Sequence, residues 1–477
     1  MITTVWNNIK SNKQFYIQII LTGILFSIPA FYNRYPLFFS DSGTYMVSLF
    51  EEKMVPMDRA FGYGFLMRII SQQLSLWPVI LFQNVVASVL IWKVLSRFFN
   101  GHIITVTHML VCIFLLTGSS LPWYSNQIMP DIITSFMILV LYLFFTSVSK
   151  YKFAYLAVLL VFLITHFSHF PILLFSATTI AGLQYFFRMH TLKNLMYKTA
   201  AVYVIVALGV VVIAAQSYKN EQGFVFSHSS NVFISGRLSE TGLLKKYLQK
   251  NCNTIQSPLC EYADSLSPSA ADFLWNDNSA INKVARKHFQ QQSNAHPTSE
   301  EKWHYLNNDL LKPVVRDLFT TPKYLVQFMY YGFRESVVQF FQINIGSGLS
   351  SYGVNSPPYW PILVHLPTEL SSFLTSVQNS GTLHFDTINL INYVVLLASF
   401  LLIWYAWITG KLSAEIKVLC VFIVVCMYWN AFFTAALANV YDRLQARVTW
   451  LFVLTALIAA VSMYTEYRKQ VGDKKSE

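Results

Sequence analysis

Residues 198–216 read KTAAVYVIVALGVVVIAAQ, a stretch whose single charged side chain is Lys198 at its start. An α-helix needs about 20 predominantly apolar residues to cross the hydrocarbon core of a bilayer, and this stretch has nearly that length. Hydrophobic residues make up 54% of the 477-residue chain and charged residues 12%, about half the charged share of an ordinary soluble domain. The stretch and the composition together predict an all-α polytopic membrane protein.

Similar stretches recur along the chain, and we expect about ten transmembrane helices. Each is expected to be helical because lipid offers the backbone no hydrogen-bond partner. The predicted spans are roughly 15–33, 75–97, 103–120, 131–148, 153–169, 171–187, 198–216, 387–409, 416–435 and 448–466.

Basic residues fall in alternate connections between the predicted spans. They are Lys10, Lys13, Arg97, Lys150, Lys152, Arg188, Lys193, Lys198, Lys411, Lys417, Arg468 and Lys469. All these connections can be cytoplasmic only if both termini are cytoplasmic, which an even number of spans satisfies. We therefore interpret the net charge of +11 as a topology signal and not as nucleic-acid binding. The predicted outer segments lack an Asn-x-Ser/Thr acceptor, which favours a bacterial inner (plasma) membrane over a eukaryotic secretory pathway.

The polar material of the chain divides it into three parts. Residues 1–216 form an N-terminal transmembrane module of about seven spans, with a first outer loop at 34–74. Residues 217–386 are expected to form a mostly helical extracytoplasmic domain, in which 324–342 suits an interfacial helix. Residues 387–477 form a C-terminal module of about three spans.

Two of the five cysteines, Cys252 and Cys260, lie in the long polar segment. If that segment faces an oxidising compartment, they can form a local disulfide. A structural zinc site is the weaker alternative, because two cysteines alone lack the other ligands that zinc needs.

The first outer loop contains the most informative polar residues, beginning with Asp41 just after the first span. A carboxylate there can deprotonate an acceptor hydroxyl as a general base. It can also ligate a divalent cation that holds a phosphate, or simply cap the helix that starts near Thr44. Tyr45 follows it closely and is a candidate substrate contact.

Asp58 and Arg59 are adjacent in the same loop, before the stretch FGYG at residues 61–64. A guanidinium suits the geometry of a donor phosphate, so Arg59 is a candidate phosphate ligand and Asp58 a candidate substrate contact. The alternative is a surface ion pair of little consequence.

Other candidates face the same predicted outer side. Asp131 opens the fourth span and is a second candidate carboxylate, although the helix dipole alone favours an acid there. His166 and His169 flank a turn and could bind metal, contact substrate or only bond to loop backbone.

The last outer loop contains Tyr441, Arg443 and Arg447. The two arginines are four residues apart and therefore share one face of a helix. Cationic residues usually mark the inner side, so their outer placement predicts a clamp for a lipid-linked phosphate, beside Tyr441 as a candidate substrate contact. Interfacial anchoring is the alternative.

This arrangement resembles the GT-C superfamily of integral-membrane glycosyltransferases. The resemblance rests on Asp41 and Tyr45 after the first span, Arg59 before a Gly-rich stretch, and an arginine in the last outer loop. It implies a GT-C-like fold, a catalytic carboxylate at Asp41 and a donor sugar carried on polyprenyl phosphate. Many members have two adjacent acidic residues at this position, whereas in this chain Asp41 is followed by Ser42. Dependence on a divalent cation (Mg²⁺ or Mn²⁺) therefore stays open.

We therefore expect a membrane glycosyltransferase that moves a sugar from a polyprenyl-phosphate-linked donor to a lipid, glycan or protein acceptor on the extracytoplasmic face. Asp41 would be the general base, and the arginines would stabilise the leaving phosphate. The alternatives are an O-antigen-type polymerase or ligase, which relies on Arg and His, a lipid or glycan transporter (flippase), and a non-enzymatic scaffold. A transporter would carry ionisable residues within its spans, and these spans are almost free of them.

Overall fold

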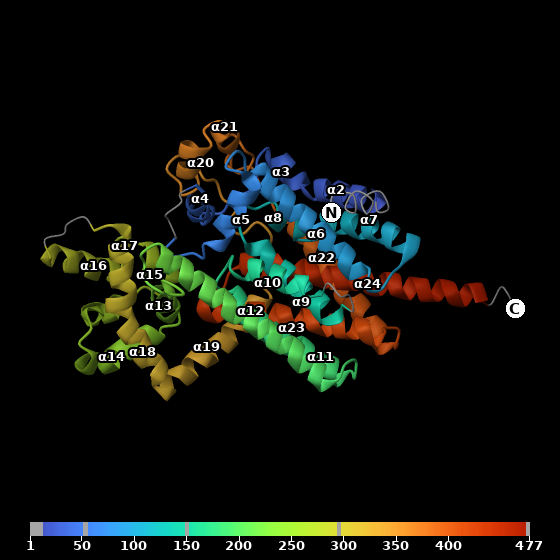
Figure 1. Cartoon of the computed structure of the whole chain (residues 1–477). Helices are drawn as coiled ribbons and strands as arrows, with labels where there is room; N and C mark the ends of the chain where they lie inside the picture. Colours follow the sequence, from blue (N-terminus) through green and yellow to red (C-terminus); the bar gives the residue numbers. More distant parts are fainter. Residues whose placement is uncertain (1–12, 51–55, 148–151, 293–296, 474–477) are drawn as a thin grey trace.

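The computed structural model describes residues 13–50, 56–147, 152–292 and 297–473 (Figure 1). Lys10 and Lys150, two of the basic residues used to predict orientation, lie outside these ranges. Within them every regular element is a helix, and the backbone makes one isolated bridge between Leu37 and Gln127. The prediction of an all-α protein is confirmed.

Seven helical segments are long and apolar enough to cross a membrane. They are α2–α3 (Lys13–Phe26 and Ile28–Asn33), α6 (Trp77–Leu95), α7 (Gly101–Gly118), α12 (Leu192–Lys219), α22 (Asp386–Ile408), α23 (Ala414–Leu437) and α24 (Asp442–Asp473). Each coincides with a predicted span. The chain therefore has the character of a polytopic membrane protein.

Three further helices lie where spans were predicted: α9 (Asp131–Thr146), α10 (Ala154–Leu163) and α11 (His169–Phe186). The first two are too short to meet the same criterion. At 1.5 Å per residue, the 16 residues of α9 extend about 24 Å, against about 30 Å for a hydrocarbon core. The total of about ten spans thus remains a prediction.

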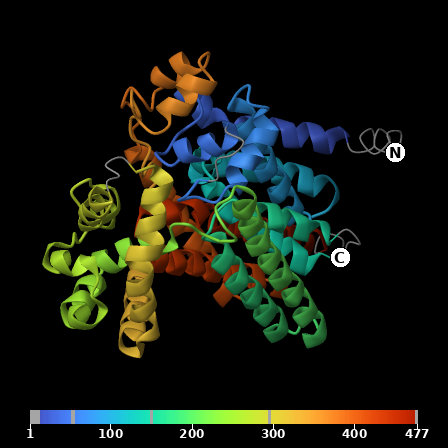
Figure 2. The same cartoon turned by 60° about the vertical axis from the view of Figure 1, so that its left-hand side comes forward.

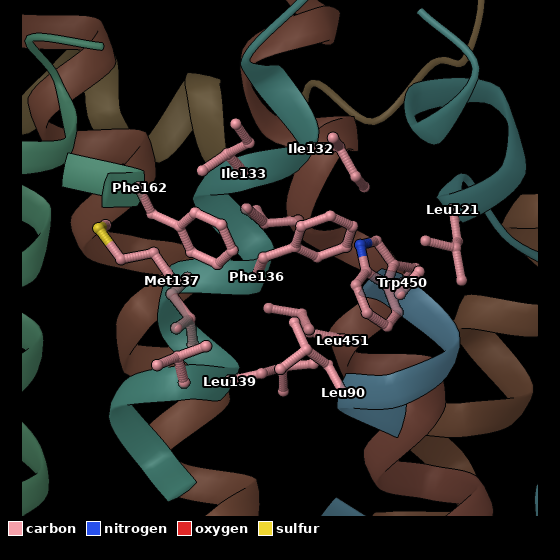
Figure 3. Close-up of a cluster of buried hydrophobic side chains, with 14 of the residues drawn as sticks. Leu90, Leu121, Ile132, Ile133, Phe136, Met137, Leu139, Phe162, Trp450 and Leu451 are labelled. Carbon is pink, nitrogen blue, oxygen red and sulfur yellow. The ribbon is translucent and has the colours of Figure 1, made fainter. Parts of the chain in front are cut away.

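α9 lies at the centre of the helix bundle. All its residues except Thr146 are buried. Figure 3 shows five of its side chains, from Ile132 to Leu139, packed among Leu90 of α6, Phe162 of α10 and Trp450 and Leu451 of α24. A helix that is apolar on every side must be enclosed by other helices or by lipid, and here its neighbours enclose it.

A second hydrophobic core lies within residues 232–324. It is built by α13 (Ser230–Glu240), α14 (Leu243–Ile255), a 3₁₀ helix (Pro258–Ser265), α15 (Ala270–Trp275), α16 (Ala280–Gln291), α17 (Ser299–His304), a π-helical turn (Tyr305–Leu311) and α18 (Lys312–Thr320). Figures 1 and 2 show this group at one end of the bundle. α2 begins and α24 ends at the opposite end.

α19 (Pro322–Phe340) connects this group to the bundle by packing along α23. Gly332 faces Ala436 so closely that an added Cβ would lie 3.1 Å from the Ala436 Cβ. The face of α19 away from Gly332 exposes Val326, Tyr330 and Val337. This two-sided pattern is typical of an interfacial helix, which remains the prediction for this segment.

The remainder of the long polar segment packs elsewhere. Residues 343–385 include α20 (Tyr359–His365) and α21 (Leu370–Leu374), and their buried side chains Tyr352, Ile362 and Phe373 join the core of the bundle. They cover the first outer loop, with its short helices α4 (Ser42–Phe50) and α5 (Gly62–Ser71). The predicted region 217–386 therefore contributes to two hydrophobic cores.

Candidate functional site

The segment that leads to Asp41 is fixed from two sides. The Leu37 N–H donates to the Asn126 carbonyl at 2.9 Å, and the Ile128 N–H donates to the Leu37 carbonyl at 2.9 Å. On the other side, the Gln378 side chain accepts from the Phe38 N–H at 3.0 Å and donates to the Phe38 carbonyl at 2.7 Å. Because both backbone polar groups of Phe38 are satisfied, the backbone three residues before Asp41 is held in one conformation.

Asp41 lies between two arginines from distant parts of the chain. Its Oδ1 is 2.9 Å from Nη2 of Arg59, and its Oδ2 is 3.7 Å from Nη1 of Arg443. The Asp41 side chain is 21% exposed, and its Oδ1 also accepts from the Ser40 hydroxyl at 3.5 Å. α4 begins at Ser42, but the carboxylate is directed at the guanidiniums and is not used as the cap that the sequence also allowed.

The two arginines outweigh the effect of burial on the Asp41 carboxyl. Burial alone would raise its pKa, but the charges of Arg59 and Arg443 lower it below the ordinary value of 3.8. For Arg59, burial would lower the pKa, while Asp41 and Asp58 raise it above its usual range. At neutral pH, the site therefore holds an ionised carboxylate between two protonated guanidiniums.

Arg59 is held by its neighbours as well as by Asp41. Its Nη1 lies 3.4 Å from the Asp58 carboxylate and donates to the Asp58 carbonyl at 2.9 Å. Both side chains are mostly buried, so this pair differs from a freely hydrated surface pair. The Arg59 guanidinium also lies 5.5 Å from the ring centroid of Phe233 on α13, which brings the second core to this site.

The glycines after Arg59 serve close packing within the protein. A Cβ on Gly62 would lie 2.3 Å from the Ile164 carbonyl oxygen, a distance that real Cβ atoms do not show. Gly62 therefore lets the start of α5 approach the end of α10.

Arg443 stacks on an aromatic ring in the first outer loop. Its Cζ lies 3.7 Å from the centroid of Phe39, within the range of a cation–π contact. Gly348, at φ +81°, makes room for that ring, because a Cβ there would lie 1.9 Å from Phe39. Although the Arg443 side chain is only 12% exposed, its Nε and Nη1 have no hydrogen-bond partner. These N–H groups can donate to an anionic ligand.

Arg447, one helical turn further along α24, is enclosed. It is 1% exposed, and its Nη1 lies 3.2 Å from Oδ1 of Asp131 at the start of α9. Its Nη2 donates to the Asn430 Oδ1 at 2.9 Å, while the Asn430 amide donates to the Leu444 carbonyl at 2.6 Å. The arginine predicted to clamp phosphate and the predicted second carboxylate are thus paired with each other inside the bundle.

Tyr45 adds a buried hydroxyl to the same region. Its ring packs edge-on to Tyr63 at 5.3 Å, and its Oη has no hydrogen-bond partner. Burial raises its pKa, and Arg59, Asp41 and Asp131 are close enough to act on it electrostatically. Tyr45 therefore adds a buried, unpaired hydroxyl near Asp41 and Arg59.

The two histidines border this cluster in different ways. His169 is fully buried: its Nδ1 lies 2.9 Å from the Phe162 carbonyl and its Nε2 lies 3.0 Å from the Thr134 hydroxyl. Both ring nitrogens are thus occupied by partners on α10 and α9. His166 is partly exposed, and its Nδ1 contacts Ser168. Burial, His169 and nearby arginines lower the His166 pKa well below its usual value.

The remaining predicted residues lie outside the cluster. The Tyr441 side chain is exposed, and its backbone is bonded to the Gln339 amide on α19. Cys252 and Cys260 form a disulfide in the second core region, with Cα atoms 5.7 Å apart. In the described ranges, no three His, Cys, Asp or Glu side chains gather as a metal site. The divalent cation stays a prediction.

Sequence reasoning missed Phe39, Gly348, Asn430 and Gln378. Asn430 had a usable signal, because an amide inside a predicted span usually bonds to another helix. Phe39 and Gly348 had none, since their roles depend on a contact between segments more than 300 residues apart in the sequence.

Comparison with protein-family models, curated proteins and solved structures gave no match for this chain.

Proposed function

We propose that this protein is a membrane glycosyltransferase that transfers a sugar from a polyprenyl-phosphate-linked donor to an acceptor on the extracytoplasmic face, in a GT-C-like fold with about ten spans. The observation that carries the proposal is the position of Asp41 between Arg59 and Arg443, 2.9 and 3.7 Å away. A carboxylate beside two guanidiniums provides a base and an anion site in one place.

The Arg443 N–H groups that make no hydrogen bond support an anion as the ligand. Buried N–H groups without an acceptor are costly, and those of Arg443 lie next to the already paired Asp41. A phosphate diester that binds Arg443 and Arg59 would supply acceptors and compete with Asp41 for them. We infer that donor binding loosens the ion pairs of Asp41 and so raises its basicity.

The transfer step then follows from these groups. The acceptor hydroxyl oxygen forms a bond to the anomeric carbon, and the bond from that carbon to the phosphate oxygen breaks. The hydroxyl proton passes to Asp41, and the phosphate leaves with the bonding electrons. Arg59 and Arg443 stabilise the charge on the leaving group. Two guanidiniums thus fill the cationic role in this step.

We assign a positioning role to Asp131 and Arg447. Their buried ion pair and the bond from Arg447 to Asn430 join α9, α23 and α24. Since Arg443 and Arg447 share α24, this pair fixes the helix from which Arg443 reaches Asp41.

The disulfide supports an extracytoplasmic location for the site. Disulfides persist in oxidising compartments such as the bacterial periplasm and are rare in the cytosol. The Cys252–Cys260 bridge belongs to the region that contributes Phe233 to the Arg59 environment. We therefore propose that this end of the bundle faces outward from a bacterial plasma membrane and that both termini are cytoplasmic.

The test is a mass-spectrometric profile of envelope glycans and polyprenyl-linked sugars in a deletion strain. The strain is complemented with the native gene, Asp41→Asn or Asp309→Asn, at equal protein levels. Asp309 is an exposed carboxylate that takes no part in the ion pairs of Asp41. We expect deletion and Asp41→Asn to lose one sugar and accumulate its lipid-linked donor, and Asp309→Asn to restore it. A native profile with Asp41→Asn would overturn the proposal.

His166 favours a second candidate, a polymerase or ligase that uses Arg and His. It is close enough to Arg59, Arg443 and Arg447 for their charges to act on it. In that case His166→Ala would abolish the product and accumulate a lipid-linked oligosaccharide, while Asp41→Asn would retain activity.

A further inference from the structure

Three aromatic side chains from three helices meet at the surface of the second core. Phe233 of α13 stacks with Trp303 of α17 at 6.1 Å between ring centroids. Trp275, the last residue of α15, lies 5.9 Å from Trp303 and 6.2 Å from Phe233. We call these three residues the aromatic platform.

The platform is only partly used for packing. Phe233 and Trp303 contact the second core, whereas the Trp275 side chain remains 53% exposed. An indole left half in water outside the candidate spans gains little from burial, and exposed aromatic clusters often mark binding surfaces. Trp275 is thus the open end of the platform.

The other end of the platform is continuous with the candidate site. Phe233 lies under the guanidinium of Arg59, 5.5 Å from its Cζ, and the same guanidinium contacts Asp41. A ligand on Trp275 would therefore lie beside the ring that contacts Arg59, close to the proposed base.

Polar side chains lie near Arg59 and on the helix of Trp303. His228 lines a small cavity together with Arg59 and Met57. Glu300 and His304 are both exposed and act electrostatically on His228. Apolar ring faces flanked by hydrogen-bonding groups suit a ligand with an apolar face and many hydroxyls.

We propose that the aromatic platform is the acceptor subsite and that it binds a glycan chain by stacking a pyranose ring on the exposed indole of Trp275. The C–H face of a pyranose packs on an aromatic ring, and its hydroxyls bond to the bordering polar groups. That the bound glycan is an acceptor rests on the proposed function. The inference narrows the acceptor class from lipid, glycan or protein to a glycan.

Direct binding tests the subsite without requiring turnover. The full-length protein in lipid nanodiscs is applied to an array of immobilised bacterial surface oligosaccharides. The variants are Trp275→Ala, Trp275→Phe, Asp41→Asn and the control Trp360→Ala, which removes a similarly exposed tryptophan from α20. We expect binding to fall at least about tenfold in Trp275→Ala, and to persist in the other three variants.

A turnover assay with envelope glycan as acceptor separates this inference from the proposed function. Trp275→Ala should raise the acceptor KM and leave the donor KM unchanged. The native protein could bind the array in a way that depends on Trp275 and yet transfer no sugar. That result would overturn the glycosyltransferase proposal and support the glycan subsite. Native protein that binds no oligosaccharide, or Trp275→Ala that binds as the native protein does, overturns the subsite. Weaker vesicle association of Trp275→Ala with glycan binding intact also overturns it, in favour of a membrane anchor.

Discussion

The Asp41–Arg443 pair and the Asp131–Arg447 pair are built from the same residue types, and their arginines lie one turn apart on α24. Asp131 and Arg447 are enclosed, and Asn430 accepts a further bond from Arg447. Asp41 and Arg443 are partly exposed, and Asp41 is shared with Arg59. Arg443 leaves two donors, Nε and Nη1, without a hydrogen bond, whereas Arg447 leaves one, Nε. The enclosed pair is suited to hold helices together and the open pair to exchange its partner for a ligand.

The largest expected effect comes from removing the base of the open pair. Asp41→Asn keeps the shape of the side chain but cannot take a proton at neutral pH. General-base catalysis contributes about 10²–10⁴-fold, so we expect the transfer rate of the purified protein to fall by about 1,000-fold. Asp309→Asn should leave the rate unchanged. An Asp41→Asn rate above one-tenth of native would show that Asp41 is not the base.

The enclosed pair is expected to affect stability next. Arg447→Met leaves the Asp131 carboxylate buried without its partner, which typically costs about 3–5 kcal/mol. Thermal unfolding in detergent should show a large loss. The double variant Asp131→Asn with Arg447→Met should recover most of it, because the uncompensated charge is gone. If Arg447→Met and Arg443→Met lose the same free energy of unfolding, the proposed difference between the enclosed and the open pair is wrong.

A smaller effect is expected from Arg443→Gln. Losing one charged hydrogen bond to the leaving phosphate corresponds to about 1.5–3 kcal/mol, or about 10–100-fold in kcat/KM for the donor. Unfolding should change little, because Arg443 is not enclosed as Arg447 is. Steady-state kinetics with a lipid-linked donor measure the first quantity. An unchanged donor kcat/KM would contradict the anion site.

The smallest effect concerns pH. Two arginines lower the pKa of Asp41 below 3.8, so the free enzyme keeps its base ionised as the pH falls from 8 to 5. A carboxylate with a lowered pKa is protonated only when the pH falls through that lowered value. Asp41 therefore keeps its function, and its contribution to stability, until the pH is that low. We expect no acidic limb in kcat/KM above about pH 4. Arg59→Gln should move the limb to higher pH, and a native limb near pH 6 would contradict the account.

Much of the bundle could be predicted from the sequence because a bilayer demands long apolar helices. The seven long candidate spans coincide with predicted ones. α9 and α10 were harder, because apolar character alone does not distinguish a helix that crosses a membrane from one enclosed by other helices. The predicted total of about ten includes both.

The candidate site could be predicted only in part. Charge on an outer loop pointed to Asp41, Arg59 and Arg443, and the structure brings these three together. Arg447 was predicted to bind phosphate together with Arg443, since residues four apart share a helical face. Their different surroundings depend on Asp131, Asn430 and Phe39, which come from other elements. Trp275 and Trp303 carry no functional signal in the sequence for the same reason, because their relation to Arg59 exists only through Phe233.

Binding of undecaprenyl phosphate tests the central claim most directly, since the open pair is proposed to exchange Asp41 for a lipid phosphate. Native mass spectrometry would compare the native protein, Asp41→Asn, Arg443→Gln and Arg447→Lys, with undecaprenol as the uncharged control lipid. The account predicts that Asp41→Asn binds undecaprenyl phosphate more tightly, because the Asp41 carboxylate no longer competes for the arginines. A loss of about 1.4 kcal/mol of that competition corresponds to about tenfold in Kd, although the variant cannot catalyse transfer. It also predicts that Arg443→Gln binds more weakly. Unchanged or weaker binding by Asp41→Asn, or equal binding of undecaprenol, would contradict it.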